Sequence, residues 1–187
     1  MKEDLQKSLE ILKEGGIILY PTDTIWGIGC DATHAEAVSR IYRIKKREDS
    51  KSMLVLVDSE DMLYRYIEHF PDMALEIIRI ATKPTTIIYT GVVDLAPNLF
   101  AEDHSIGIRI TTDSFCGQLI RQSGKPIVST SANLSGQTPP AHFSEISNDI
   151  KSAVDYVVRW RQNETRKGVP SSIIKIDLNN EVQIIRE

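Results

Sequence analysis

The chain has 187 residues, of which 41% are hydrophobic and 26% are charged, and a formal net charge of −4. These values indicate one globular domain and exclude a disordered or fibrous chain, and no apolar run approaches the roughly 20 residues of a membrane helix. The acidic balance argues against a protein whose main task is to bind nucleic acid. Two isolated cysteines and a polar N-terminus without a secretory signal lead us to expect a cytoplasmic protein with no membrane contact.

Helical and strand patterns alternate along the chain, which predicts an α/β domain over residues 1–187. We expect helices at 3–14, from 33 onward, 59–67, 71–81, around 115–124 and 144–153. Strands are expected at 16–20, 52–58, 85–89, 106–110, 126–130 and 154–158, with a hairpin of 172–178 and 181–186. Residues 91–104 and 161–170 read as long loops. Thr33 and Glu36 have the spacing of a capping box.

The first polar loop, PTDTIWGIGCD, follows the strand expected at 16–20. Thr22, Asp23 and Thr24 offer small polar groups, and two glycines permit close backbone approach. Loops at strand ends are the usual ligand sites of α/β sheets. A tight turn stabilised by the Asp and Thr side chains explains the pattern equally well.

The second segment, residues 40–51, concentrates basic side chains. A solvated helix end explains such a run, because cations there complement the helix dipole. Lys45 and Arg47, however, lie two residues apart where the helix should end, so both can project to one side. A Lys–Arg pair suits a triphosphate, with lysine as a point charge and arginine as a planar bidentate donor.

The third segment, STSANLSG, is expected just after the strand at 126–130. Its hydroxyl and amide groups can bind phosphate or carboxylate oxygens, although plain turn chemistry also accounts for them. The sequence contains no GxSxG, GxxxxGK[ST] or GxGxxG motif, which argues against a serine hydrolase, a P-loop or a dinucleotide fold. The four histidines have no ligand spacing, so we expect no protein-held metal site.

In combination and in this order, these segments resemble the YrdC-like family of threonylcarbamoyl-AMP synthases along nearly the whole chain. PTDTIWGIGCD is similar to the family's PTDT-x-YGL segment, and Lys45-Lys46-Arg47 matches its KxR motif. The SxN motif is matched by Ser131-Ala132-Asn133. Three further segments resemble the VRVP-like strand, the PST-I/V segment and the closing ILR, namely 107–110, 170–173 and 185–186.

The resemblance implies a twisted mixed β-sheet flanked by helices around a large, positively lined cavity. It implies an enzyme, a nucleotidyltransferase that makes L-threonylcarbamoyladenylate and pyrophosphate from L-threonine, bicarbonate or CO2, and ATP. Mg²⁺ is expected with the triphosphate. A tRNA-modifying complex would then transfer the threonylcarbamoyl group to adenosine in tRNA, and weak RNA binding would be compatible with this role.

The resemblance also implies residue roles. The catalytic set at the ATP phosphates comprises Lys45, Arg47, Ser131 and Asn133, with Asn133 holding either the turn or a phosphate. Further ATP contacts are expected from Lys51, Ser105, Ser171, Ser172 and Arg186. Threonine contacts are expected from Thr24, Arg109 and Ser129.

The chain departs from the family pattern at several positions. These are Trp26 in place of Tyr, Lys51-Ser52-Met53 in place of x-Pro-Leu, Lys83-Pro84-Thr85-Thr86 in place of GPLT, and Ser172 in place of Thr. Two alternatives therefore stay open, a paralogue of the same fold with weak or different nucleotide-dependent activity, and an RNA-binding or ribosome-associated module that uses the basic stretch. The carbamoyl-AMP module of hydrogenase maturation is disfavoured, because its zinc-finger and acylphosphatase regions have no counterpart here.

Overall fold

Short apolar strands and amphipathic helices alternate along the chain, as expected. The computed structural model describes residues 1–46 and 53–187, and the strands of these residues form one nine-stranded sheet. The helices are α1 (Lys2–Lys13), α2 (Ala35–Lys45), α3 (Glu60–Arg65), α4 (Asp72–Ile80), α5 (Ser114–Ser123) and α6 (Asn148–Ala153), with short 3-10 helices η1 (Pro97–Leu99) and η2 (Phe143–Glu145). The strands are β1 (Ile18–Tyr20), β2 (Gly27–Gly29), β3 (Leu54–Val57), β4 (Thr85–Tyr89), β5 (Ile106–Ile110), β6 (Ile127–Ser131), β7 (Tyr156–Val157), β8 (Ser172–Ile176) and β9 (Val182–Arg186).

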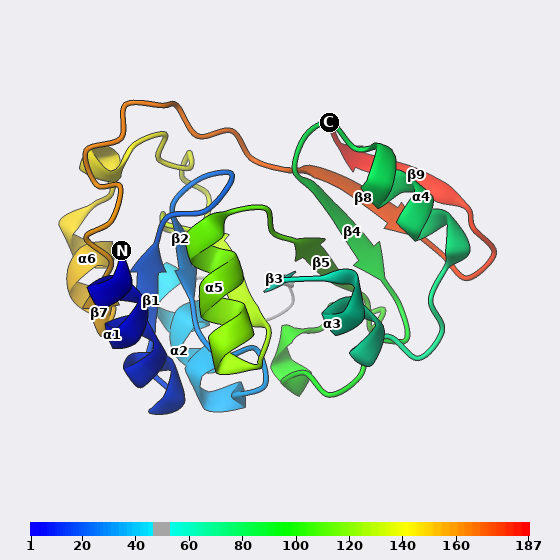
Figure 1. The fold of residues 1–187 in the computed structure, drawn as a ribbon, viewed down its shortest axis with the longest axis horizontal. Coiled ribbons are helices and arrows are strands. Elements are labelled where there is room, and N and C mark those ends of the chain that lie inside the picture. The colour runs from blue at the N-terminus through cyan, green and yellow to red at the C-terminus, as the bar shows by residue number, and fades with distance from the viewer. Residues whose placement is uncertain (47–52) are drawn as a thin grey trace.

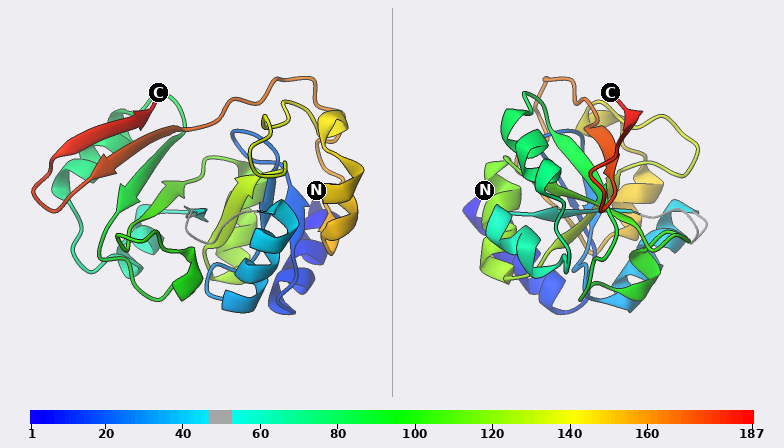
Figure 2. Two further views of the ribbon diagram at one scale, coloured as in Figure 1. Left: turned by 180° about the vertical axis from the view of Figure 1, so that it is seen from behind. Right: turned by 90° about the vertical axis from the view of Figure 1, so that its right-hand side faces the viewer.

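The sheet is mixed, with the strand order β7-β1-β2-β6-β3-β5-β4-β8-β9. Three pairs are parallel, β1 with β7, β3 with β5, and β4 with β8, and the other neighbours are antiparallel. Figures 1 and 2 show α1 and α5 on one face of the sheet and α2 and α6 on the other. The predicted mixed α/β fold with flanking helices is confirmed.

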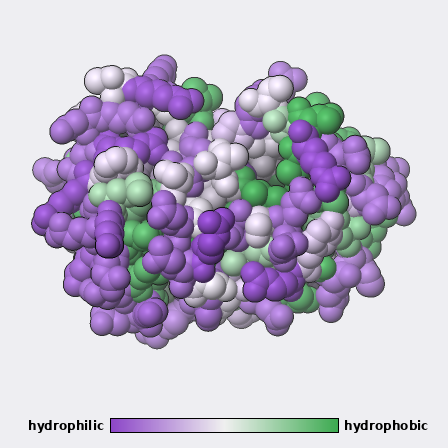
Figure 3. Space-filling model, viewed as in Figure 1, coloured by the Kyte–Doolittle hydropathy of each residue, from purple (hydrophilic) through white to green (hydrophobic). Residues whose placement is uncertain are grey.

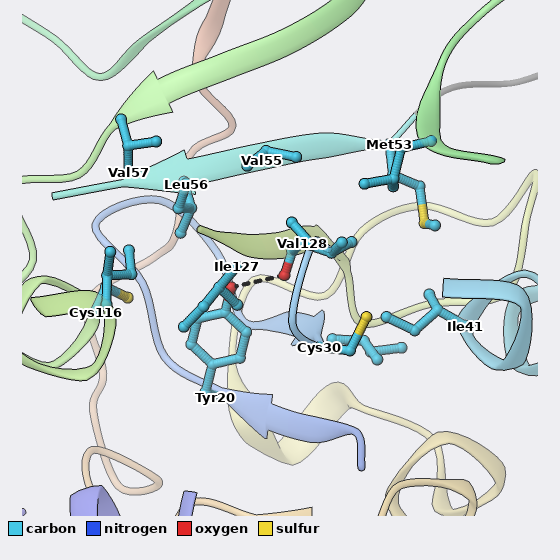
Figure 4. Packing of buried hydrophobic residues seen from close by; sticks show 14 of the residues in the cluster. Tyr20, Cys30, Ile41, Met53, Val55, Leu56, Val57, Cys116, Ile127 and Val128 are labelled. Atoms are coloured by element: carbon cyan, nitrogen blue, oxygen red, sulfur yellow. Dashed lines mark hydrogen bonds between the residues drawn. The ribbon is translucent and has the colours of Figure 1, made fainter. Parts of the chain in front are cut away.

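The core lies between the sheet and these helices. Side chains such as Leu19, Ile28 and Leu56 are fully buried, and each stabilises the fold by roughly 1.5–3 kcal/mol. Figure 4 shows Tyr20 within this packing, where its hydroxyl donates a hydrogen bond to the Val128 carbonyl at 3.2 Å. The polar tip of Tyr20 is therefore satisfied inside the apolar layer.

Two local expectations were wrong. Residues 27–29, expected in a loop, form strand β2, which pairs with β1 and β6. The cap of α2 is His34, whose Nδ1 accepts a hydrogen bond from the Ala37 amide at 3.2 Å. Thr33 forms no capping box, because its hydroxyl and amide both bond to Asp31 Oδ1, at 2.7 and 2.8 Å.

Several other elements differ in length from the expectation. Helix α3 ends at Arg65, and Ile67 instead forms a β-bridge with Val92. The helix expected at 144–153 is split into η2 and α6, with Ser147 as the N-cap of α6. Strand β6 ends at Ser131, one residue beyond the expected strand, so the first three hydroxyl residues of the segment STSANLSG lie within the strand.

One long segment crosses the molecule. The chain leaves β7 at one edge of the sheet and runs to β8 beside the other edge (Figure 1). Residues 161–170 of this crossing are called the strap below. The hairpin of β8 and β9 then forms the second edge, and every residue of β9 is exposed. Figure 3 shows apolar atoms gathered mainly on this half of the molecule, where Ile80, Ile184 and Ile185 are exposed. No helix of the described residues is long and apolar enough to cross a membrane.

Candidate active site

Two cavities adjoin each other between the turn at residues 22–26 and the strap. The central cavity has a volume of about 230 Å³, and the strap cavity a volume of about 270 Å³. Thr24, Ile25 and Pro170 line both and form the wall between them. Six of the predicted site residues line the central cavity, namely Thr24, Arg109, Ser129, Ser131, Ser171 and Arg186. They come from strands β5, β6 and β9, from the turn that holds Thr24 and from the residue before β8, so the fold brings together positions far apart in sequence.

The predicted SxN motif forms a turn that is tied to the end of α2. Lys45 is the last residue of α2 and is only 1% exposed. Its Nζ donates to the carbonyl oxygens of Ser131 and Asn133, both at 2.6 Å. The Ser135 amide in turn donates to the Lys45 carbonyl at 2.8 Å. The lysine therefore holds residues 131–135, called the SAN turn below, from inside the protein.

The Asn133 side chain also stabilises this turn. Its Nδ2 donates to the carbonyl oxygens of Leu134 and Gln137, at 2.8 and 2.7 Å. Among the described residues its Oδ1 is buried and has no hydrogen-bond partner. Of the two predicted roles for Asn133, this geometry favours holding the turn, because the donors that a phosphate would need are already used.

Arg109 is the most buried charged group of the central cavity, at 3% exposure. Its Nη2 donates to Asp23 Oδ1 at 2.9 Å and to Thr24 Oγ1 at 3.3 Å. Within the described residues its Nε is buried without a hydrogen-bond partner. Asp23 was noted as a polar group of the loop but was not among the predicted site residues. A buried arginine with one fixed edge and one open donor is suited to bind a carboxylate.

Arg186 and Ser171 lie close together on the opposite wall. The Arg186 Nε and Nη2 donate to the Ser171 carbonyl at 2.9 and 2.7 Å, and the Ser171 hydroxyl shares a 2.8 Å hydrogen bond with Thr86. Burial and the nearby charge of Arg109 lower the pKa of Arg186. Among the described residues that line the central cavity none is acidic, so the two guanidinium groups give its wall positive charge.

Two predicted nucleotide contacts lie elsewhere. Ser172 is the first residue of β8, and it lines a third cavity between α4 and the β8–β9 hairpin. The Ser105 hydroxyl donates to Asp103 Oδ1 at 2.6 Å, and Lys175 Nζ donates to Asp103 Oδ2 at 2.6 Å. Neither serine lines the central cavity.

The Asp103 contacts give a prediction about pH. The Lys175 ammonium and then the Ser105 hydroxyl lower the pKa of Asp103 to about 2, below the ordinary value of about 3.9. Because the folded-state pKa is lowered, the carboxylate stabilises the fold at neutral pH, and this contribution disappears as the pH falls from about 4 to about 2. We expect NMR titration of the Asp103 carboxyl to give a midpoint near 2, and the stabilities of wild type and Asp103→Asn to converge there. An ordinary midpoint would contradict the contact with Lys175.

The remaining predicted residues and departures divide into three groups. Arg47 and Lys51 lie outside the described residues. Trp26 is 6% exposed and packs against Phe143, with ring centroids 4.7 Å apart. Lys83 and Pro84 line the strap cavity, whereas Met53 and Thr86 line the central cavity.

The described residues offer neither a reactive thiol nor a metal cluster. Burial raises the pKa of the Cys30 and Cys116 thiols, so neither is a thiolate at neutral pH. No group of three or more His, Cys, Asp or Glu side chains within the described ranges is placed to hold a metal ion.

Comparison with known sequences reveals relatives of similar length. A protein of Xanthomonas axonopodis pv. citri named threonylcarbamoyl-AMP synthase is 31% identical over 159 residues, which cover 83% of this chain and 84% of that protein. A protein of Methanocaldococcus jannaschii is 35% identical over 191 residues, which cover the whole of this chain and 88% of that protein. Its name assigns it provisionally to the same activity.

Solved structures share the fold. Escherichia coli YciO matches with a TM-score of 0.85 and 23% identity, over all of this chain and 90% of that one. Sua5 of P. abyssi, solved with L-threonine, matches with a TM-score of 0.80 and 21% identity. The match covers 92% of this chain and 50% of the Sua5 chain. The family profile Sua5/YciO/YrdC, described as telomere recombination, matches residues 10–187. The chain therefore belongs to the Sua5/YciO/YrdC family.

Proposed function

We propose that this chain is an L-threonylcarbamoyladenylate synthase, a nucleotidyltransferase that forms threonylcarbamoyl-AMP and pyrophosphate from L-threonine, bicarbonate or CO2, and ATP. The observation that carries the proposal is that two groups of predicted site residues line one central cavity. Relatives of the chain are named for this reaction. The groups are those expected at threonine, Thr24, Arg109 and Ser129, and those expected at the nucleotide, Ser131, Ser171 and Arg186.

The amino-acid side of the site is the buried Arg109. Arg109 lines the central cavity, and no acidic residue stands in the described lining to compete for its guanidinium. A threonine carboxylate can accept from this guanidinium, since charge-assisted hydrogen bonds to guanidinium are the strong ones. Thr24 and Ser129 line the same cavity, where their hydroxyl groups would orient the substrate.

The reaction needs no covalent intermediate with the protein. The threonine amine takes up CO2, loses one proton and becomes a carbamate. A carbamate oxygen attacks the α-phosphorus of ATP as the bond to pyrophosphate breaks. The chain's contribution is to position the two substrates and to stabilise charge, through the SAN turn and through Arg47 and Lys51. Mg²⁺ would enter with the triphosphate and neutralise its charge, since Mg²⁺ is usually bound through substrate phosphates and water.

One alternative is weakened by the contacts of the basic stretch. Arg40 forms a 3.0 Å ion pair with Asp155, and Lys45 is buried in the SAN turn. Arg40 is therefore paired at the surface and Lys45 is used inside the protein, which leaves fewer cations for an RNA backbone. A paralogue of the same fold with a different nucleotide reaction is the remaining alternative. In the proposed role a tRNA-modifying transferase complex consumes the product.

Pyrophosphate release tests the proposal. We expect purified protein with ATP and Mg²⁺ to release pyrophosphate only when threonine and bicarbonate are both present, and mass spectrometry to detect threonylcarbamoyladenylate. Omitting either substrate is the control for plain ATP hydrolysis. ATP binding without this release would favour the paralogue. RNA binding that weakens steeply with salt, together with no ATP binding, would favour the RNA-binding module.

A further inference from the structure

The ion pair between Arg109 and Asp23 differs from the other ion pairs of the described residues in the burial of both partners. The side chains are 3% and 7% exposed, whereas each of the others has at least one partner that is 24% exposed or more. Taking two charges out of water is costly, and such pairs persist where their geometry is well supported. The pair therefore fixes two charged groups at one position inside the fold.

Asp23 stands behind Arg109 as seen from the central cavity. Arg109 lines the central cavity, while Asp23 lines the strap cavity on the other side of the wall. Asp23 Oδ1 accepts from Arg109 Nη2 at 2.9 Å, and its Oδ2 accepts from the Thr112 amide at 3.4 Å. The carboxylate is thus anchored at both oxygens and occupies one edge of the guanidinium.

We propose that Asp23 is a positioning residue that fixes the guanidinium plane of Arg109, so that its remaining donors select a free carboxylate on the amino-acid substrate. The inference rests on the proposed function for the identity of that substrate. Planar, bidentate recognition requires a guanidinium held in one orientation, and a small misplacement of a positioning group is costly for binding and catalysis. Asp23 contacts Arg109 and does not line the central cavity.

A purely electrostatic role predicts the opposite sign. If Asp23 only weakened the positive charge of Arg109, the change Asp23→Asn would leave a stronger cation and threonine would bind more tightly. If Asp23 positions Arg109, Asp23→Asn keeps the size of the side chain, loses the charge-assisted contact and weakens threonine binding. The direction of the change in KM for threonine therefore separates the two roles.

The first measurement is the kinetics of Asp23→Asn. We expect KM for threonine to rise by about 10- to 50-fold, while KM for ATP stays within about twofold. The matched control is Asp58→Asn, because Asp58 is also an aspartate of low exposure, at 8%, that bonds to an arginine. Its partner Arg121 is 69% exposed and does not line the central cavity. This control should leave both constants at the wild-type values.

The second measurement needs no turnover. Calorimetry should show that the wild-type protein binds threonine more tightly than neutral threoninamide. In Asp23→Asn the ratio of these two affinities should fall by at least about tenfold. Asp23→Glu keeps the buried charge pair, and its longer side chain should displace the guanidinium and weaken threonine binding without loss of folding. If both variants kept the wild-type preference, or lost ATP and threonine affinity equally, the positioning role would be overturned. Absence of pyrophosphate release by wild type would count against the proposed function alone, since the binding comparison is independent of it.

Discussion

Replacing Lys45 by methionine is expected to reduce threonylcarbamoyladenylate formation by about 100-fold. The change keeps the length of the side chain but removes the ammonium that donates to the carbonyl oxygens of Ser131 and Asn133. Both acceptors lose a strong donor inside the protein, and each unsatisfied buried group costs about 1–3 kcal/mol. The SAN turn should then leave its position, which places the serine of the motif away from the nucleotide. Pyrophosphate release and the free energy of unfolding measure the two effects.

The adjacent Lys46 provides the control. It is exposed and adopts a left-handed conformation with φ 50 at the end of α2, so Lys46→Met makes the same chemical change outside the SAN turn. This variant should retain nearly full activity. Loss of ATP affinity in Lys45→Met without any loss of stability would show that Lys45 acts directly on the triphosphate instead. Wild-type turnover in Lys45→Met would exclude both roles.

Gly29→Ala is expected to give the largest loss of stability, about 3 kcal/mol or more. Gly29 is a buried residue of β2. A Cβ at this position would clash with the backbone carbonyl oxygen of Val128 and would lie 2.7 Å from the Tyr20 ring. Backbone oxygens cannot move aside as a flexible side chain can. The sheet between β1 and β6 would therefore have to separate. Chemical denaturation should show a lower midpoint at an unchanged slope.

A second glycine serves as a control of opposite sign. Gly117 lies inside α5, and among the described residues no atom outside its own stretch of the helix stands within 4 Å of where its Cβ would be. Because alanine is the better helix former, Gly117→Ala should stabilise the protein by about 0.5–1 kcal/mol. Equal effects from the two changes would contradict the packing around Gly29.

The sequence patterns that predicted the fold correctly were those with many matching positions. Helices α1 and α5 are predicted from apolar spacing and a glycine at the end, and β5 from the alternation of isoleucines with Gly107 and Arg109. Strand β2 could not be found in this way, because Gly27 and Gly29 have low strand propensity and sit inside a turn-like motif. It is a strand because β1 and β6 provide partners on both sides, which is information about tertiary structure. The same limit explains the cap of α2, because Thr33 has a preferred N-cap side chain but its hydroxyl bonds to Asp31, which leaves His34 as the cap.

The candidate site was also predictable only in part. The motifs predicted which residues would gather, and six of them line one cavity. Their individual contacts depend on direction, which local patterns leave undetermined. Lys45 points into the protein toward carbonyl oxygens, and Ser172 lines the third cavity whereas Ser171 lines the central one. Asp23 was available as a signal, since a carboxylate within a short polar loop needs a cationic partner if it is buried. Nothing in the loop itself indicates that this partner is Arg109, 86 residues later.

The path of the strap has a consequence for biosynthesis. A growing polypeptide made as far as β7 contains Thr24, Arg109 and Ser129 but lacks Ser171 and Arg186. Strand β4 then has no β8 beside it, and its exposed edge is a template for pairing with other chains. Because domains fold as units while they are synthesised, the pocket becomes complete only after β8 and β9 have been made. A truncated chain would thus carry an open strand edge and no competent pocket, so that premature termination would yield a candidate for chaperones and proteases and not a partly active enzyme.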